Sequence, residues 1–394
     1  MTGPEDQIPG KSLGVMAAPF LGATAVYDML THRVTLVSPL AGVLLEVASM
    51  SRTEQVFIDE LADDVVASTG SPKDAVVAAL CATIDGLVEA DLLGRPTVWG
   101  PDPIVGGAPL VQGRDGSDTP SSAGFGSTLH VFDERLAFRS TDADLLADID
   151  RWLHPPPSTD EPTVVFDADP TPVGGVFLQA AEVWEFPDRC GFQLQLPGVV
   201  NDWAARSSTL LVLHAGGLRT PDGSVVLLPG VPEAGKSTMT AAFVAAGCDY
   251  LGDELVAVRP DSLQAVGFPG PFSLDDTSRR VLGLESAASN SPYAPLADVR
   301  HDAQPIVGDA GAVTQMIVPI YDALLGAPEI QSLSPRDALE VLLRSVMNLA
   351  RCGEDGWRTL CQLAERVPTR IVRHPDAPSF ARSELRPRRS RGPG

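Results

Sequence analysis

Apolar residues follow a helical period in the first part of the chain. Over residues 71–90 they lie three or four positions apart, which predicts a helix with one buried face. These apolar positions are Val76, Leu80, Ile84 and Leu87. Shorter patterns predict a strand pair at 27–36 and helices at 39–49 and 56–68. Together the patterns predict a small α+β domain over residues 13–94.

The pattern changes after this domain. Residues 95–127 are dense in Gly, Pro, Ser and Asp and keep no period, which is typical of a linker or a long loop. Strand-like and helix-like stretches then alternate over 128–378 and predict an α/β domain. The expected strands include 129–132, 136–138 and 163–166, and the expected helices include 142–153, 334–349 and 356–367. The Arg-rich end, 379–394, predicts a basic, disordered tail.

Charge and cysteine content narrow the setting of the protein. The 51 acidic residues outweigh the 29 basic ones, and the formal net charge of −22 argues against nucleic-acid binding. The most apolar stretch, 34–48, is interrupted by Pro39 and Glu46 and is too short to span a membrane. The start of the sequence lacks a secretory signal, and the five cysteines are scattered without a CxxC pair. We therefore expect a cytoplasmic protein with neither a disulfide framework nor a zinc site.

The strongest chemical signal lies around residue 230. An apolar stretch, 225–228, leads into Gly-Val-Pro-Glu-Ala-Gly-Lys-Ser, and a helix is expected over 236–246. This matches the GxxxxGK[ST] spacing of a phosphate-binding loop, in which backbone N–H groups at the start of a helix attract phosphate oxygens. Lys236 would contact the β- and γ-phosphates, and Ser237 would bind Mg²⁺. The residues expected to bind the nucleotide are Gly230, Val231, Pro232, Glu233, Ala234, Gly235, Lys236, Ser237 and Thr238.

Two adjacent carboxylates follow this loop. Asp253 and Glu254 come sixteen residues after Ser237, at the end of a short expected strand. An enzyme that transfers a phosphoryl group needs a carboxylate there, either as a second Mg²⁺ ligand or as the base for the acceptor hydroxyl. The alternative is an exposed acidic turn without a chemical role.

Other candidate residues leave two interpretations open. His214 lies shortly before the loop and is either a packed core histidine or a contact to the nucleotide. Arg279 and Arg280 follow two aspartates, and they belong either to an exposed capped helix or to a phosphate clamp.

The loop and the acid pair resemble a known family. The loop, a helix of about three turns and Gly-Asp-Glu-Leu-Val at 252–256 resemble the P-loop kinases related to HPr kinase/phosphorylase. Leu-His-Ala at 213–215 and the segment 267–274 extend the resemblance. It implies that ATP and Mg²⁺ bind here, that Asp253 is the base and a metal-linked group, and that Glu254 assists. The Glu-x-Arg-Gly signature of true HPr kinase/phosphorylases is not found, so the better resemblance is to divergent members encoded with ribosomally made, modified peptides.

The N-terminal segment resembles a PqqD-like domain. The stretch 25–45 and the end Leu-Val-Glu-Ala-Asp-Leu-Leu at 87–93 carry this resemblance. It implies a small winged-helix fold that binds a peptide as an added strand at an open sheet edge. The expected fold class is thus α/β: a P-loop kinase core of the HPr-kinase type, preceded by a winged-helix, PqqD-like α+β domain.

The function expected from these observations is an ATP- and Mg²⁺-dependent kinase. Its acceptor would be a serine or another hydroxyl of a peptide or protein substrate, such as a ribosomal precursor peptide. Two alternatives stay open: a nucleotide-gated peptide-binding protein without transfer activity, and a small-molecule kinase. We expect neither a nucleic-acid nor a membrane partner, and the sequence leaves assembly into a homo-oligomer open.

Overall fold

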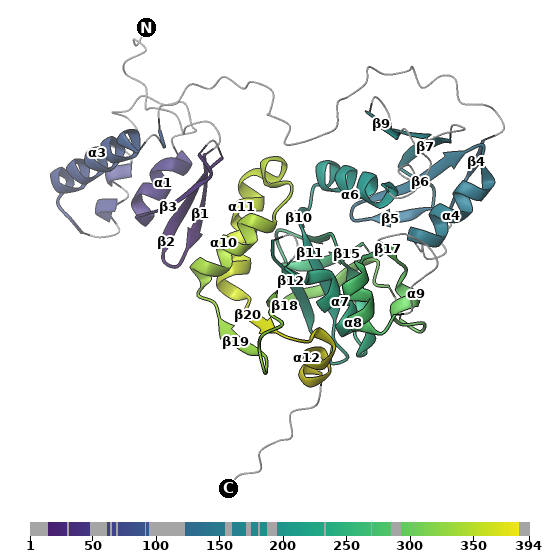
Figure 1. Ribbon diagram of the computed structural model, residues 1–394. Helices are drawn as coiled ribbons and strands as arrows, with labels where there is room; N and C mark the ends of the chain where they lie inside the picture. Colours follow the sequence, from purple (N-terminus) through teal and green to yellow (C-terminus); the bar gives the residue numbers. More distant parts are fainter. Residues whose placement is uncertain are drawn as a thin grey trace. The chain divides into compact units, whose positions relative to one another are not determined.

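The protein is a mixed α/β chain with several β-sheets (Figure 1). The computed structural model describes residues 15–29, 31–47, 61–63, 65–67, 70–90, 92–93, 123–153, 160–170, 175–179, 182–186, 195–231, 234–268, 270–284, 293–303 and 305–385. The chain divides into two compact units, one of residues 1–105 with 353–365 and one of residues 106–352 with 366–394. This division departs from the predicted segments because 353–365, expected within the 128–378 domain, belongs to the N-terminal unit.

The first unit contains a three-stranded antiparallel sheet. Strands β1 (Val15–Phe20), β2 (Ala23–Asp28) and β3 (Arg33–Val37) follow one another in the sheet as they do in the chain. Residues 27–36 supply parts of β2 and β3, so this strand pair was predicted, whereas β1 was missed.

Helices cover this sheet. They include α1 (Pro39–Val47) and α3 (Lys73–Glu89), and residues 61–63 and 65–67 are also helical. Helix α3 buries the four residues that the sequence period singled out: Val76, Leu80, Ile84 and Leu87. These predicted helices are therefore confirmed where the structure describes them, while residues 48–49 of the first predicted helix and residues 56–60, 64 and 68 of the second lie outside the described residues.

A distant helix completes the core of the first unit. Helix α11 (Leu349–Arg366) is interrupted at Gly353, whose φ of 55° and ψ of −138° are not helical. After this break, Trp357 is fully buried, and its indole N–H donates a hydrogen bond to the Ala25 carbonyl at 2.9 Å. The indole also stacks on the ring of Tyr27, with centroids 5.3 Å apart. A segment more than three hundred residues along the chain thus packs on β2.

The second unit is built on a nine-stranded sheet. Its main path is β10 (Leu211–Leu213), β14 (Val256–Val258), β15 (Gln264–Gly267), β18 (Gly308–Tyr321), β12 (Val225–Pro229), β11 (Ala215–Arg219) and β13 (Asp249–Gly252). Strand β20 (Thr369–His374) pairs with β18 and with β19 (Glu329–Ser332).

The strand directions gather several strand ends at one edge. Strands β12, β18 and β20 are parallel, and β11 is antiparallel to both β12 and β13. Strand β13 therefore runs in the same direction as β12. The carboxyl ends of all four parallel-running strands lie at the same edge of the sheet, which is where open α/β sheets carry their sites.

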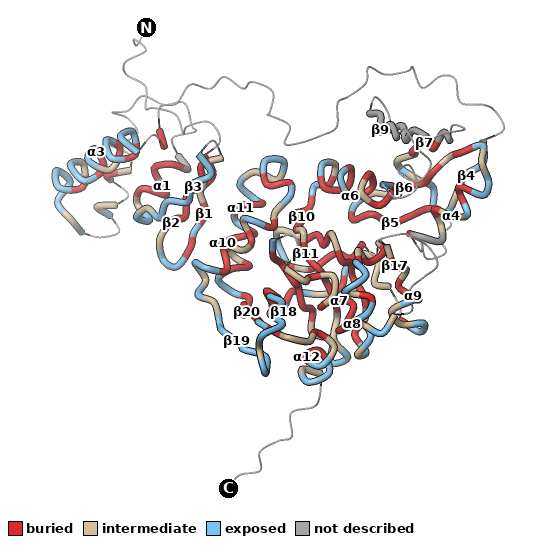
Figure 2. The backbone as a smooth tube through the Cα atoms, in the orientation of Figure 1, coloured by how far each residue is buried: buried red, intermediate tan, exposed pale blue. Residues whose placement is uncertain are grey.

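Helices α7 (Lys236–Ala245) and α12 (Ala377–Glu384) cover one face of this sheet (Figure 1). Val226 and Leu228 of β12 pack with Phe243 of α7 and Phe380 of α12 in one buried cluster. Figure 2 shows buried residues concentrated in these central strands and in α7. The predicted tail at 379–394 was wrong at its start, because buried Phe380 holds α12 against the sheet.

Further helices flank this layer. Helix α8 (Asp276–Leu282) and the short α9 (Leu296–Val299) lie near α7, with the strand pair β16 (Phe272–Ser273) and β17 (Tyr293–Ala294). Helix α10 (Pro335–Ser345) follows β19 and begins at Ser334, whose hydroxyl accepts a hydrogen bond from the Asp337 N–H. The predicted helix at 334–349 is confirmed as α10, which ends four residues earlier than expected.

A smaller six-stranded sheet precedes the central one. It comprises β4 (Gly124–Phe125), β5 (Leu129–Val131), β6 (Glu134–Ser140), β7 (Val164–Pro170), β8 (Gly175–Gln179) and β9 (Glu182–Phe186). Helices α4 (Ala143–Leu153) and α6 (Leu196–Ser207) pack against it. Their shared core joins Phe166 and Trp203 to Val212 and Phe268 of the central sheet. Strand β4 lies in the segment predicted as linker, most of which is outside the described residues.

Candidate functional site

The loop between β12 and α7 presents free backbone donors. Strand β12 is fully buried, and the chain turns at Gly235, which has a φ of 88° in the left-handed region. Gly235 is the N-cap of α7, and no side chain of the described residues caps this helix. The first N–H groups of α7 are thus left to bind an anion, which the helix dipole also favours. Of the other predicted loop residues, Val231 is exposed and Ala234 is half-buried, while Pro232 and Glu233 lie outside the described residues.

The side chain of Lys236 is buried, and its ammonium group contacts the backbone of this loop. Its side chain is 5% exposed, and its ammonium group donates to the Val231 carbonyl at 3.0 Å. Burial lowers the pKa of Lys236, whereas the negative charges of Glu254 and Asp253 raise it. The charge is therefore held between the loop backbone and the two acids.

Asp253 is a buried carboxyl group with unused hydrogen-bonding capacity. It is 2% exposed, and its Oδ2 accepts a hydrogen bond from the Ser273 N–H at 3.0 Å. Its Oδ1 is buried and has no hydrogen-bond partner among the described residues. Burial and the neighbouring charge of Glu254 raise the pKa of Asp253 to about 7, although Ser273, Ser237 and Lys236 act in the opposite direction. This carboxyl group can therefore gain or lose a proton near neutral pH.

Glu254 has the opposite environment. Its Oε2 lies 3.0 Å from Nε2 of His214, and this contact is the main reason why the pKa of Glu254 is lowered. His214 lies between β10 and β11, and its backbone N–H donates to the Ser345 carbonyl at 2.7 Å. The two interpretations of His214 did not include this partner, which is 40 residues away in the sequence.

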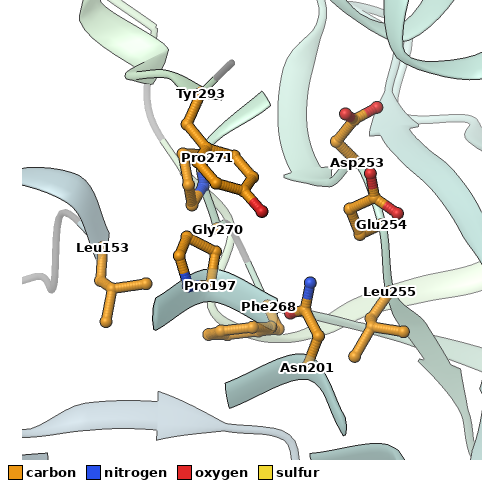
Figure 3. A pocket seen from close by; sticks show the side chains of 10 residues that line it. All are labelled: Leu153, Pro197, Asn201, Asp253, Glu254, Leu255, Phe268, Gly270, Pro271 and Tyr293. Atoms are coloured by element: carbon orange, nitrogen blue, oxygen red, sulfur yellow. The ribbon is translucent and has the colours of Figure 1, made fainter. Parts of the chain in front are cut away.

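A pocket opens on the side of the two acids (Figure 3). Figure 3 shows the Tyr293 hydroxyl and the Asn201 amide pointing into it, on the same side as the carboxylate of Glu254. Its lining residues are Leu153, Pro197, Asn201, Asp253, Glu254, Leu255, Phe268, Gly270, Pro271 and Tyr293. Asp253 belongs both to this lining and to the surroundings of Ser237, so it links the loop to the pocket.

No protein-family model matches the chain, and the search of curated proteins also found no match. The function must therefore be inferred from the chemistry of this site.

Thr238, the last of the predicted loop residues, contacts a residue of α8. The Thr238 hydroxyl lies 2.6 Å from the Ser278 hydroxyl, so its oxygen is already engaged, while Ser237 beside it faces Asp253. Helix α8 is capped by Asp275, whose carboxylate accepts from the Ser278 N–H at 2.7 Å.

Helix α8 is capped by Asp275, as one interpretation expected, but Arg279 is not exposed as that interpretation required. Arg279 is buried and donates to the carbonyls of Leu274 and Tyr293, and Arg280 is exposed. Arg279 thus holds together the segments on both sides of α8, next to the pocket.

The oxygen donors beside the loop suit a magnesium ion. Within the described ranges, no three His, Cys, Asp or Glu side chains gather as a metal cluster. Mg²⁺ is commonly bound through one or two carboxylates together with substrate phosphates and water, and does not need an all-protein cage. The Ser237 hydroxyl and the unpartnered Oδ1 of Asp253 fit that requirement.

The sequence motifs predicted the loop and the acid pair, but not the other residues of the site. Asn201 on α6 and Tyr293 on β17 line the pocket from distant segments. Neither residue lies in a recognisable motif, so no signal in the sequence could have indicated them. Across the described part of the chain, no helix is both long and apolar enough to cross a membrane.

Proposed function

We propose that the protein is an ATP- and Mg²⁺-dependent kinase that phosphorylates a hydroxyl group of a peptide or protein. The observation that carries this proposal is the position of Asp253, a buried carboxyl group between Ser237 at the loop and the adjacent pocket. A phosphoryl-transfer enzyme needs such a group between donor and acceptor. The loop, α7 and the acid pair at the end of β13 support a P-loop core of the HPr-kinase type.

The triphosphate would be bound by the loop backbone and Lys236. The first N–H groups of α7 attract phosphate oxygens, and the Lys236 ammonium, now on the Val231 carbonyl, neutralises charge at the β- and γ-phosphates. Ser237 and Asp253 would hold Mg²⁺, which when bound offsets the negative charge of the phosphates.

Asp253 would accept the proton of the substrate. The acceptor hydroxyl oxygen forms a bond to the γ-phosphorus while the bond to the bridging oxygen of ADP breaks, and the hydroxyl proton passes to Asp253. Without a bound metal ion, burial and the charge of Glu254 raise the pKa of this carboxyl group to about 7. Glu254, held by His214, stays ionised and raises the pKa of its neighbour.

The first unit supports a peptide as the acceptor. The observed order of strands and helices is compatible with a winged-helix, PqqD-like domain. Strand β3 is at the end of its sheet, and Val34 and Leu36 are exposed on it. A peptide that adds as a strand here would use backbone hydrogen bonds and these apolar side chains, so a basic surface is not required.

The test is transfer of label from γ-³²P-ATP to short serine-containing peptides encoded beside the gene. We expect Lys236→Met and Asp253→Asn to reduce transfer by at least about a hundredfold, as loss of one charge-stabilising group does in other enzymes. The matched control is Lys73→Ala, because Lys73 is another of only three lysines and forms a salt bridge with Asp63 in the first unit. This control should keep the parental rate.

Other outcomes separate the alternative functions. Equal transfer by the parent and both site variants would contradict the proposal. Peptide binding that depends on ATP but leaves no label would instead identify a nucleotide-gated binding protein. Label on a small hydroxylated metabolite and on no peptide would identify a small-molecule kinase.

A further inference from the structure

The carboxyl ends of β18 and β20 form a second set of side chains beside the loop. Tyr321 ends β18 and is 53% exposed, and its partner in the parallel register is His374, which ends β20. Their ring centroids are 6.0 Å apart. A Cβ atom placed on Gly235 would lie 3.8 Å from the Cβ of Tyr321, so this tyrosine borders the start of α7. None of these side chains has a part in the proposed transfer step.

His374 has hydrogen-bonding capacity that the fold leaves unused. It is 1% exposed, and neither ring nitrogen has a hydrogen-bond partner among the described residues. A buried polar group without a partner costs free energy, so its retention calls for a reason. His374 shares its face of the sheet with Tyr321, because residues paired in register point to the same side.

The order of the strands indicates how a bound nucleotide is oriented along the edge of the sheet. Asp253 follows β13, which is separated from β12 by β11, whereas β18 and then β20 lie on the opposite side of β12. If the γ-phosphate faces Asp253, the nucleoside end of the molecule extends toward Tyr321. An exposed aromatic ring at that position suits stacking against a flat nucleobase.

We propose that Tyr321 and His374 form the nucleobase subsite. The base stacks on the exposed Tyr321 ring, and the buried His374 ring supplies a hydrogen bond to the base edge once a movement of Tyr321 uncovers it. This inference rests on the proposed function, since it requires a nucleotide at the loop. It adds a recognition element that the phosphate-binding motif does not contain.

The test compares two ligands by calorimetry on the full-length protein: MgADP, which has a base, and magnesium tripolyphosphate, which has none. Tyr321→Ala should weaken MgADP binding about tenfold, equivalent to about 1.4 kcal/mol, and leave tripolyphosphate binding unchanged. Tyr321→Phe should keep the parental affinity because it keeps the ring. Phe125→Ala is the control, since this phenylalanine on β4 is similarly exposed at 57%.

His374→Phe tests the second residue through the ratio of the two affinities. Loss of the hydrogen bond should lower the MgADP affinity relative to tripolyphosphate, whereas general damage to the fold would weaken both ligands together. If the parent binds both ligands and Tyr321→Ala leaves their ratio unchanged, the subsite is refuted and the proposed function stands. If the parent binds neither ligand, the proposed function fails and the subsite with it.

Discussion

Asp253 and Glu254 are adjacent in the chain, yet their surroundings act on them in opposite directions. Burial and the charge of Glu254 raise the pKa of Asp253 to about 7, while the hydrogen bond from His214 lowers the pKa of Glu254. Neighbouring carboxyl groups whose pKa values are pushed apart are typical of acid–base sites. At the residue scale, this difference supports the proposed roles of Asp253 as the proton acceptor and Glu254 as a fixed charge.

The same difference predicts opposite effects on stability. The pKa of Asp253 is higher in the folded state than in the unfolded chain. Its contribution to the free energy of unfolding is therefore complete below about pH 4 and is lost as the pH rises toward 7. An amide does not ionise, so the Asp253→Asn variant does not lose this stability as the pH rises. It should therefore be more stable than the parent at pH 8 by on the order of 4 kcal/mol, and by much less at pH 4. Urea unfolding at the two pH values measures the difference.

Glu254→Gln is the matched comparison. The lowered pKa of Glu254 gives stability that is present above its unfolded value and is lost as the pH falls through the folded value. This variant should therefore be less stable than the parent at pH 8, opposite in sign to Asp253→Asn. If the advantage of Asp253→Asn did not grow between pH 4 and pH 8, the environment inferred for Asp253 would be wrong.

The candidate site was predictable only where it is local in the sequence. Gly235, Lys236 and Ser237 form a continuous motif, and the acid pair follows within one helix and one strand. The contact between His214 and Glu254 depends on how two distant strands end, and the unused oxygen of Asp253 depends on what buries it. Such properties arise from tertiary packing, on which periodicity carries no information.

At the scale of elements, α11 also shows that the sequence pattern predicts a helix but not its tertiary contacts. The sequence predicted a helix at 356–367, and this is confirmed, but nothing in its pattern identified β2 as the partner of Trp357. The residue before this helix contacts a different part of the chain, at strand β10. The Asn348 side chain accepts a hydrogen bond from the Val212 N–H at 2.9 Å and donates one to the Leu210 carbonyl at 2.8 Å. The break at Gly353 separates these two attachments.

Trp357→Ala should destabilise the first unit. Removing a fully buried tryptophan leaves a cavity, which costs about 3–5 kcal/mol, and leaves the Ala25 carbonyl without its donor. Hydrogen exchange followed by mass spectrometry should show faster exchange in β1 and β2, with little change in β12 and α7. The control is Trp203→Ala on α6, a buried tryptophan of the second unit. Loss of protection in the same peptides for both variants would contradict this assignment.

At the scale of the whole molecule, the compact units do not follow the order of the sequence. Residues 353–365 complete a unit whose other residues are 1–105. Deleting 1–94 would therefore expose Trp357, and lost activity in such a deletion would not show what the first unit binds. A substitution of an exposed residue of β3, such as Leu36→Asp, keeps residues 1–94 in the chain and tests peptide recruitment more directly.

This arrangement predicts that the N-terminal fragment cannot fold properly without a segment from the other end of the chain. The fragment 1–105 lacks the indole that stacks on Tyr27 and binds the Ala25 carbonyl, so it should unfold with low cooperativity. Joining residues 353–365 to it through a flexible Gly/Ser linker should restore a cooperative urea transition, because the segment returns the missing core. The same fusion carrying Trp357→Ala should fail to restore it, which separates the effect of the indole from that of added length. A cooperative transition of equal midpoint in the fragment alone would show instead that α11 only rests on a domain that is already complete.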